Sequence, residues 1–287
     1  MSDISYKIPL APGAGERASA WRPGWLGRAF SQVCAHAPTV ALGLAVPLAV
    51  LALWSYAVQQ QWFSPLILPA PSLVWDTLSD LVATGELQSE LLVSFGRVLA
   101  GLAVGGGLGF LFGIAFGLWR PLDIYVSPTV RAICLVPSLG WLPFFMLLFG
   151  IGEALKIILI AKTCFLPLMV SSYEGLRNRP RKFDEVAAVL ELPWATRVRR
   201  VILPSILPSI LTGLRLALSK GWKALILVEM ISSASGIGYL MMWGRKAFQL
   251  DVVFSTIVVV GLVGWLLDWA LLKGQHRVTG WSFKTAG

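Results

Sequence analysis

The stretch VLAGLAVGGGLGFLFGIAFGLW, residues 98–119, decides the fold, because none of its 22 positions carries a charged side chain. A helix needs about 20 predominantly apolar residues to cross the hydrocarbon of a bilayer. Arg97 and Arg120 bound the stretch at its two ends. The pattern predicts a membrane-spanning helix.

Glycine recurs at every fourth position of this predicted span, as Gly101, Gly105, Gly109, Gly113 and Gly117. Such a stripe lies on one face of a helix and lets a neighbouring backbone approach closely, which is how helices associate in lipid. The neighbour could belong to the same chain or to a second copy. Either way, the stripe predicts that this helix lies inside a bundle.

Five further segments are long and apolar enough to span: 39–58, 132–150, 155–173, 206–230 and 253–272. Segment 132–150 contains Pro137 and Pro143, which predict a kinked or only partly helical span. Only 14% of all residues are charged, against about 25% in a typical soluble domain. The sequence therefore predicts an all-α membrane protein with six transmembrane helices.

The basic residues orient these spans, because loops on the cytoplasmic side carry an excess of lysine and arginine. A six-span arrangement with both termini cytoplasmic places 16 of the 24 basic residues in cytoplasmic segments. Arg245 and Lys246, in an outer segment, are an exception. The prediction comprises a largely disordered cytoplasmic leader at 1–37, a transmembrane domain at 38–275 and a cytoplasmic tail at 276–287. Topology accounts for the net charge of +9, so no nucleic-acid partner is expected.

Nothing in the chain indicates an enzyme. The three cysteines are too scattered for a disulfide framework or zinc site, and the two histidines lie near opposite ends. No GxxxxGK[ST] phosphate loop is present, so the chain cannot hold a nucleotide in the usual way. We expect no catalytic residues, no metal and no cofactor bound by this chain.

Segment 72–94 has apolar residues at helical spacing, including Leu73, Trp75, Leu78 and Leu81. Its position between the first two spans and its Trp75 are typical of a helix lying at the outer membrane interface.

The connection 174–204 between the fourth and fifth spans is long for a helix bundle, and long loops tend to be functional. Its sequence predicts a short helix at Glu185–Leu192 and a second at Trp194–Ile202. The apolar side chains of the first helix could lie in a partner's groove, or the whole connection could be a solvated charged loop. We assign Arg197, Arg199 and Arg200 mainly to topology and the membrane surface.

The stretch EVAAVLELPWATRVRRVILP, residues 185–204, resembles the EAA loop of ABC importer permeases, EAA-x3-G-x9-I-x-L-P. Glu185, Ala187, Leu203 and Pro204 match the motif, whereas Val186, Glu191 and Val201 depart from it. Further stretches between about 60 and 275 are similar to the nitrate, sulfonate, taurine and bicarbonate branch, among them LPAPSLVWDTLSDLVATGEL, LLFGIGEALKIILIA, ILPSILPSILTGLRLAL and SGIGYLMMWGRKAFQLDVVF.

The resemblance implies a type I ABC importer fold in the bacterial cytoplasmic (inner) membrane. It implies a complex of two permeases, two cytoplasmic ATPases that bind ATP and Mg²⁺, and a periplasmic solute-binding protein. The EAA loop then serves as a coupling helix on the ATPase, formed by Glu185, Val186, Ala187, Ala188, Val189, Leu190, Glu191 and Leu192. The transported solute is expected to be small and anionic, and the second permease to be another copy of this chain.

A self-sufficient secondary transporter or channel is the alternative function. Such proteins often show paired repeats with broken helices, and no convincing internal repeat is visible in this chain.

Charged residues within the predicted spans are candidates for the solute path, because charges in spans normally face the bundle interior or a water-filled cavity. The candidates are Lys162 in the fourth span, with Arg215, Lys220, Lys223 and Glu229 in the fifth. The three lysines are expected at a similar depth, where they could attract an anion. Alternatively, Lys220 or Lys223 could pair with Glu229, or a lysine could extend toward the membrane surface.

Overall fold

A computed structural model describes residues 45–179, 185 and 189–279. All regular secondary structure in these residues is helical, in agreement with the predicted all-α class. The predicted leader at 1–37 and residues 280–287 of the predicted tail lie outside the described residues, as do Val186, Ala187 and Ala188 of the predicted coupling helix.

Four helical segments in the described part of the chain are long and apolar enough to cross a membrane: Glu86–Leu118, Glu153–Arg177, Trp194–Ser232 and Leu250–Thr279. They contain the second, fourth, fifth and sixth predicted spans. Their elements are α3 (Glu86–Gly101), the π-helical turn η1 (Leu102–Gly106), α4 (Gly107–Leu118), α8 (Glu153–Arg177), α10 (Trp194–Arg197), the π-helical turn η3 (Val198–Ile202), α11 (Leu203–Ser232) and α13 (Leu250–Thr279).

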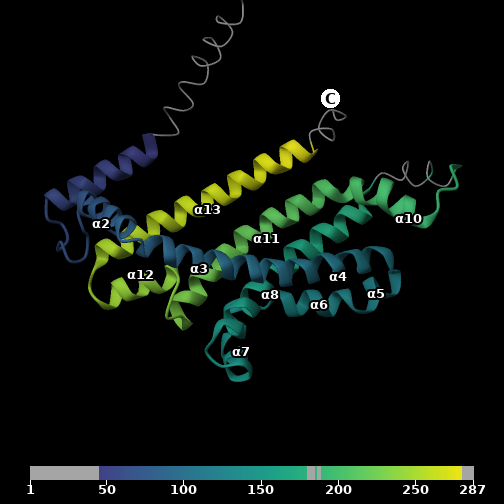
Figure 1. Cartoon of the computed structure of the whole chain (residues 1–287), viewed down its shortest axis with the longest axis horizontal. Helices are drawn as coiled ribbons and strands as arrows, with labels where there is room; N and C mark the ends of the chain where they lie inside the picture. The colour runs from purple at the N-terminus through teal and green to yellow at the C-terminus, as the bar shows by residue number, and fades with distance from the viewer. Residues whose placement is uncertain (1–44, 180–184, 186–188, 280–287) are drawn as a thin grey trace, which may run out of the picture. The chain divides into compact units, whose positions relative to one another are not determined.

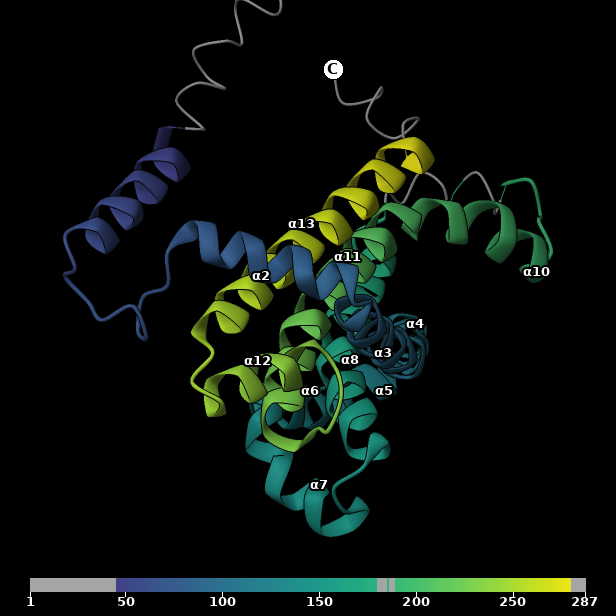
Figure 2. The ribbon, with the colours of Figure 1, turned by 60° about the vertical axis from the view of Figure 1, so that its left-hand side comes forward.

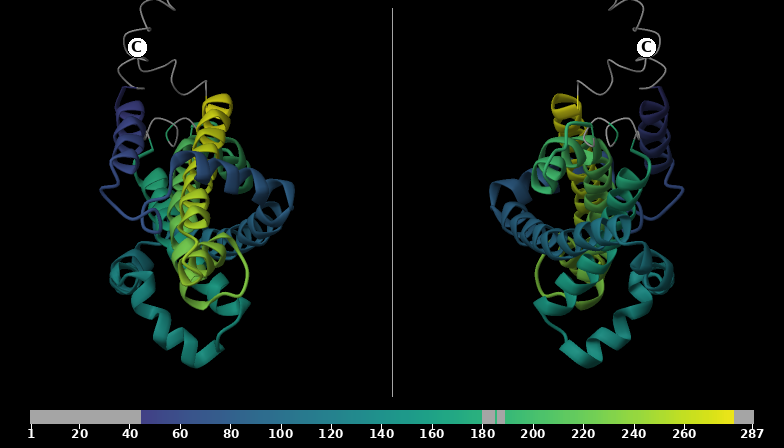
Figure 3. Two further views of the ribbon diagram at one scale, coloured as in Figure 1. Left: turned by 90° about the vertical axis from the view of Figure 1, so that its left-hand side faces the viewer. Right: turned by 90° about the vertical axis from the view of Figure 1, so that its right-hand side faces the viewer.

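The predicted third span is broken. After the short helix α5 (Arg120–Tyr125), α6 (Ser127–Leu135) ends just before Pro137, and the 3₁₀ turn η2 (Ser138–Trp141) leads into α7 (Leu142–Phe149). The two halves meet at an angle of 90°. The kink expected from the two prolines is therefore present, and α7 projects from the neighbouring helices (Figures 1 and 3).

The predicted first span, 39–58, overlaps the apolar helix Ala45–Gln59, whereas positions 39–44 lie outside the described residues. The chain divides into two compact units within this helix, at Tyr56 and Ala57.

The predicted single helix at 72–94 is wrong. Helix α2 (Pro71–Ala83) ends at a turn where Gly85 has a φ of 78°, and α3 begins at Glu86 and continues into the second span. The left-handed backbone at Gly85 breaks the helix at no steric cost, because glycine has no Cβ. Helix α2 lies against α13, where the hydroxyl of Ser255 donates a 2.8 Å hydrogen bond to the carbonyl oxygen of Val74 (Figure 2).

The glycine stripe faces α8 of the same chain. A Cβ on Gly105 would lie 1.9 Å from the carbonyl oxygen of Ala161, and one on Gly109 would lie 2.3 Å from that of Phe165. The other three stripe glycines also contact α8. Packing within one chain, one of the two arrangements that the sequence left open, therefore explains the stripe, and α4 runs along α8 (Figure 1).

The core forms around α8, because α11 packs on another of its faces. Leu159 and Ile160 on α8 have no exposed surface. A Cβ on Gly213 of α11 would lie 2.5 Å from Cβ of Ser171, and one on Gly221 would lie 2.7 Å from Sγ of Cys164. Glycines on both neighbouring helices thus bring their backbones close to α8. The short helix α12 (Ile237–Lys246) follows α11 and lies between it and α13 in the sequence.

Candidate functional site

The predicted coupling segment lies at the end of the bundle where α8 ends and α10 begins. Glu185 and Val189 are helical, but Leu190 and Glu191 form a turn, so the helix does not extend to Leu192 as predicted. Val189 is 82% exposed and Leu190 63% exposed, whereas Leu192 is partly buried. Two exposed apolar side chains at the tip of a basic connection form a small surface that a partner groove can cover.

Glu191 occupies the position where the EAA motif has glycine, and its φ is 48°. This left-handed conformation costs a residue with a Cβ roughly 1–2 kcal/mol, and glycine adopts it freely. The backbone therefore turns at Glu191 in a conformation that favours glycine, although the glycine itself is absent. The predicted second helix of the connection is present as α10 and η3, which continue without a break into α11.

Lys162 of α8 reaches the break between α6 and α7. Its Nζ donates a 2.5 Å hydrogen bond to the carbonyl oxygen of Val136 and lies 5.7 Å from the ring centroid of Trp141. Beside it, the hydroxyls of Ser138 and Thr163 lie 2.7 Å apart. A cation at the carboxyl end of α6 is favourable, because the last carbonyl groups of a helix have no partner within the helix. Lys162 thus ties α8 to the bend.

Arg215 of α11 pairs with Asp268 of α13. The guanidinium donates two hydrogen bonds to the carboxylate, of 2.5 and 2.6 Å, and both side chains are partly exposed. This two-point contact neutralises the charge of Arg215 and fixes the two helices at one register.

Lys220 and Lys223 are exposed on α11. Neither ammonium group has a hydrogen bond or ion pair to any residue in the described ranges, whereas the two other charged candidates of α11, Arg215 and Glu229, both do. Cys164 lies against Gly221, so Lys162 is at nearly the same level as Lys220 and Lys223, but it points to α6 instead of α11. The three lysines therefore lie at a similar level along α8 and α11, but on two different sides.

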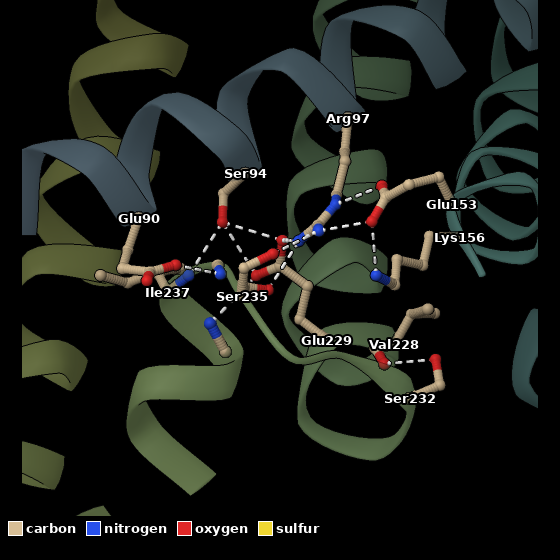
Figure 4. Close-up of polar contacts among 12 residues, drawn as sticks. Glu90, Ser94, Arg97, Glu153, Lys156, Val228, Glu229, Ser232, Ser235 and Ile237 are labelled. Carbon is tan, nitrogen blue, oxygen red and sulfur yellow. Dashed lines mark hydrogen bonds and ion pairs between the residues drawn. The ribbon is translucent and has the colours of Figure 1, made fainter. Parts of the chain in front are cut away.

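Arg97 of α3 forms the centre of a buried polar cluster that the sequence reading missed (Figure 4). Its Nε and one NH2 group donate to Glu153 at 2.7 Å each, and its NH1 group donates at 2.7 Å to Glu229. The remaining N–H groups bond to the carbonyl oxygen and hydroxyl of Ser235, at 2.7 and 2.8 Å. All five guanidinium N–H groups therefore have acceptors.

Glu229 of α11 is completely buried in this cluster and accepts further hydrogen bonds (Figure 4). The hydroxyl of Ser94 lies 2.8 and 2.9 Å from its two oxygens, and the backbone N–H of Gly238 donates at 3.0 Å. A Cβ on Gly236, whose φ is 105°, would lie within 2.6 Å of this carboxylate. The sequence alternative in which Glu229 pairs with Lys220 or Lys223 is wrong, because Arg97 is its partner.

Carboxylates and a hydroxyl also satisfy the amino end of α12. The N–H of Gly236 donates to Glu90, that of Ile237 donates to Ser94 at 2.9 Å, and that of Gly238 donates to Glu229. Negative charge is favourable at this end of a helix. Lys156 joins the cluster through a 2.7 Å bond to Glu153, so the cluster holds the cations Arg97 and Lys156 and the carboxylates of Glu90, Glu153 and Glu229. The cluster thereby connects α3, α8, α11 and α12 through hydrogen bonds and ion pairs.

The sequence signal for this cluster was Arg97, which the sequence analysis considered only as the residue that bounds a predicted span. The glycines on both sides of Ile237 indicate that the SGIG segment approaches another part of the chain closely. The sequence does not show which part, because that depends on which helices are neighbours. In the part of the chain that the structure describes, no three His, Cys, Asp or Glu side chains are placed to hold a metal ion.

Comparison with known families gives a match to the family described as binding-protein-dependent transport system inner membrane component, over residues 105–278. The putative aliphatic sulfonates transport permease protein SsuC of Bacillus subtilis is 35% identical over 83% of this chain and 87% of its own length. The taurine transport system permease protein TauC of Escherichia coli is 32% identical over 84% of this chain and 90% of its own. The bicarbonate transport system permease protein CmpB of Synechococcus elongatus is 29% identical over 62% of this chain and 65% of its own.

Among solved structures, an inward-facing form of the MetNI methionine ABC transporter matches with a TM-score of 0.53. The match has 19% sequence identity and covers 64% of this chain and 94% of the solved chain. At this identity the similarity concerns the fold alone. The family match and the curated relatives show that the chain belongs to the binding-protein-dependent inner membrane transport components, as an ABC transporter permease of the nitrate, sulfonate, taurine and bicarbonate branch.

Proposed function

We propose that this chain forms the solute pathway of an ABC importer, as one of two identical permease subunits in the bacterial inner membrane. Two cytoplasmic ATPases bind ATP and Mg²⁺ and dock on the segment Glu185–Leu192. A periplasmic solute-binding protein delivers the solute at the opposite end of the bundle. The permease itself performs no chemistry.

The exposed pair Val189 and Leu190 carries the docking part of the proposal. Both side chains are apolar, exposed and located at the end of the bundle to which the basic residues give a cytoplasmic orientation. The EAA-like sequence around them supports the same role. One chain supplies one such segment, so a complex with two ATPases requires two permeases.

The solute class rests on the relatives. Their names specify aliphatic sulfonates, taurine and bicarbonate, which carry anionic groups. We therefore propose a small anion as the solute, with its identity selected first by the binding protein.

The proposal is tested by uptake of radiolabelled taurine, ethanesulfonate and bicarbonate in cells that express the permease with its ATPase and binding protein. Uptake should require all three proteins. Glu185→Arg and Leu190→Arg should insert normally, fail to retain the ATPase on purification and abolish uptake. Uptake by the purified permease alone under an ion gradient would support the alternative of a secondary transporter.

Phe248→Arg is the matched control for ATPase retention. Phe248 is 80% exposed, like Leu190 it is apolar, and it lies between α12 and α13, at the other end of α11 from the coupling segment. Its replacement should leave ATPase retention unchanged. Equal retention by the parent, Leu190→Arg and Glu185→Arg would reject the docking segment.

A further inference from the structure

The exposed side chains of α11 are both polar and apolar, with Leu203 and Ile231 exposed near its two ends. Thr212, Lys220 and Lys223 are exposed, and Leu216 and Leu227 share this face with them. Four partly buried residues of the same helix add further polar groups: Ser205, Ser209, Arg215 and Ser219. At 100° per residue, Ser205, Thr212, Ser219 and Lys223 fall within about 40° of one line along the helix. We define this polar stripe as Ser205, Ser209, Thr212, Ser219, Lys220 and Lys223.

The exposed face of α13 is apolar in its membrane-spanning part. Its large exposed side chains in the membrane-spanning part are Ile257, Val258, Leu262, Trp265, Leu266 and Trp269. This is the composition expected of a face in contact with lipid. Because α11 and α13 pack against each other, the exposed faces that differ in polarity lie at the same level of one bundle.

The depth of the lysines disfavours simple contact with lipid. Helix α11 has 30 residues and is therefore about 45 Å long, against about 30 Å for the hydrocarbon. With the hydrocarbon centred on the helix, Lys220 lies about 4 Å and Lys223 about 8 Å from its middle. Charged side chains at such positions face water-filled cavities or other protein, because transfer into lipid is costly.

Two hollows flank the stripe. One of about 280 Å³ lies between α11 and α13, with Lys223 and Ser219 on its wall beside the Arg215–Asp268 pair. The other, of about 260 Å³, lies between α8 and α11, with Ser205, Ser209 and Thr212 on its wall. The surface around the stripe is thus hollowed near its lysines and again near the coupling segment.

We propose that the polar stripe of α11 is one wall of a water-filled path, which a second copy of this chain closes from the other side, and that Lys220 and Lys223 hold the anion there. The inference deepens the proposed function, on which it rests for the identity of the solute. Paired Arg215 and buried Glu229 take no part in anion binding. Lys162, which faces α6, lies outside the stripe.

Cysteine accessibility in the assembled complex tests this path without knowledge of the solute. In a variant with Cys34, Cys134 and Cys164 replaced by alanine, Ser219→Cys is treated with the anionic sulfonatoethyl and the cationic trimethylammonioethyl methanethiosulfonate. Leu262→Cys is the matched control, because Trp222 donates to the carbonyl oxygen of Val260 and thereby sets Leu262 near the level of Lys220. Ser219→Cys should react at least tenfold faster than Leu262→Cys, and with a preference for the anionic reagent.

Removing the lysine charges tests the anion site. Lys220→Gln with Lys223→Gln should reverse or abolish the reagent preference at Ser219→Cys, whereas Lys162→Gln should preserve it. Equal reaction of Ser219→Cys and Leu262→Cys would overturn the path, and an unchanged preference after both lysine substitutions would overturn the anion site. Fast reaction of Ser219→Cys without ATP-dependent uptake would instead reject the importer and keep the path, so the two proposals fail separately.

Discussion

The guanidinium of Arg97 lies 2.7 Å from the carboxylate of Glu229, and this contact joins α3 and α11 across 132 positions of the sequence. Both side chains are buried, at 4% and 0% exposure. Removal of one partner from such a pair leaves an uncompensated charge in a medium that solvates it poorly.

Arg97→Gln should therefore lower the free energy of unfolding by about 3–5 kcal/mol. The measurement is the thermal unfolding of the purified permease in detergent. Arg177→Gln is the matched control, because Arg177 also pairs with a carboxylate but is 67% exposed, and its replacement should have little effect. Glu229→Gln should cost less in the background of Arg97→Gln than it does alone, because the guanidinium that loses one of its two carboxylate partners in the parent is then absent. Equal midpoints for the two arginine variants would contradict a structural role for the cluster.

The glycine stripe predicts a sharp difference between two neighbouring glycines of one helical segment. Gly105→Ala forces a methyl group against the carbonyl oxygen of Ala161, whereas a Cβ on Gly107 meets no atom within 4 Å. We expect Gly105→Ala to destabilise the permease by roughly 1–3 kcal/mol, as overpacking does. Gly107→Ala should be neutral or stabilising by up to about 1 kcal/mol through helix propensity. The measurement is the thermal unfolding of both variants. Similar unfolding midpoints would show that α4 and α8 separate easily.

The backbone at Glu191 predicts how the coupling segment tolerates substitution. Glu191→Gly should retain the ATPase at least as well as the parent, because glycine adopts a φ of 48° without strain. Glu191→Val should weaken retention, because a β-branched residue is a genuine outlier in this conformation. Co-purification at matched expression provides the comparison. Better retention of the ATPase by the valine variant than by the glycine variant would contradict a left-handed backbone at Glu191.

The contact between Lys162 and Val136 predicts a role in holding the bend between α6 and α7. Lys162→Met removes the cation from the carboxyl end of α6, a contribution of about 0.3–2 kcal/mol. Hydrogen exchange of the amides at 138–142 should accelerate by up to about 30-fold, while the amides of α13 exchange as in the parent. Lys162→Arg keeps the charge and should restore most of the protection. Unchanged hydrogen exchange in the Lys162→Met variant would show that Lys162 does not stabilise the bend.

Much of the fold was predictable from the sequence, because hydropathy, proline and glycine act locally. The uncharged stretch at 98–119 lies, except for Trp119, within one long helical segment, Pro137 follows the end of α6, and the glycine stripe marks a packed face. The break at Gly85 was missed, since a single glycine is compatible with a continuous helix until its φ is known. Helix boundaries within apolar or amphipathic runs are decided by such local turns.

The partners of the charged residues were not predictable in the same way. Arg97, Glu153 and Glu229 lie far apart in the chain, and only the packing of α3, α8 and α11 brings them together. The sequence established that Arg215, Lys220 and Lys223 lie within a span, but not which side of α11 each one occupies. That distinction separates the paired Arg215 from the two exposed lysines.

The close backbone packing of α8 has a mechanical consequence. Gly213 and Gly221 of α11, together with the stripe glycines, bring the two neighbouring helices close to α8. We expect a push at the coupling segment to tilt α8 and α11 together, over the roughly 45 Å length of α11. With the docking proposed above, a displacement at the coupling segment is expected to reach Arg97 and Glu229 at the far end of these helices.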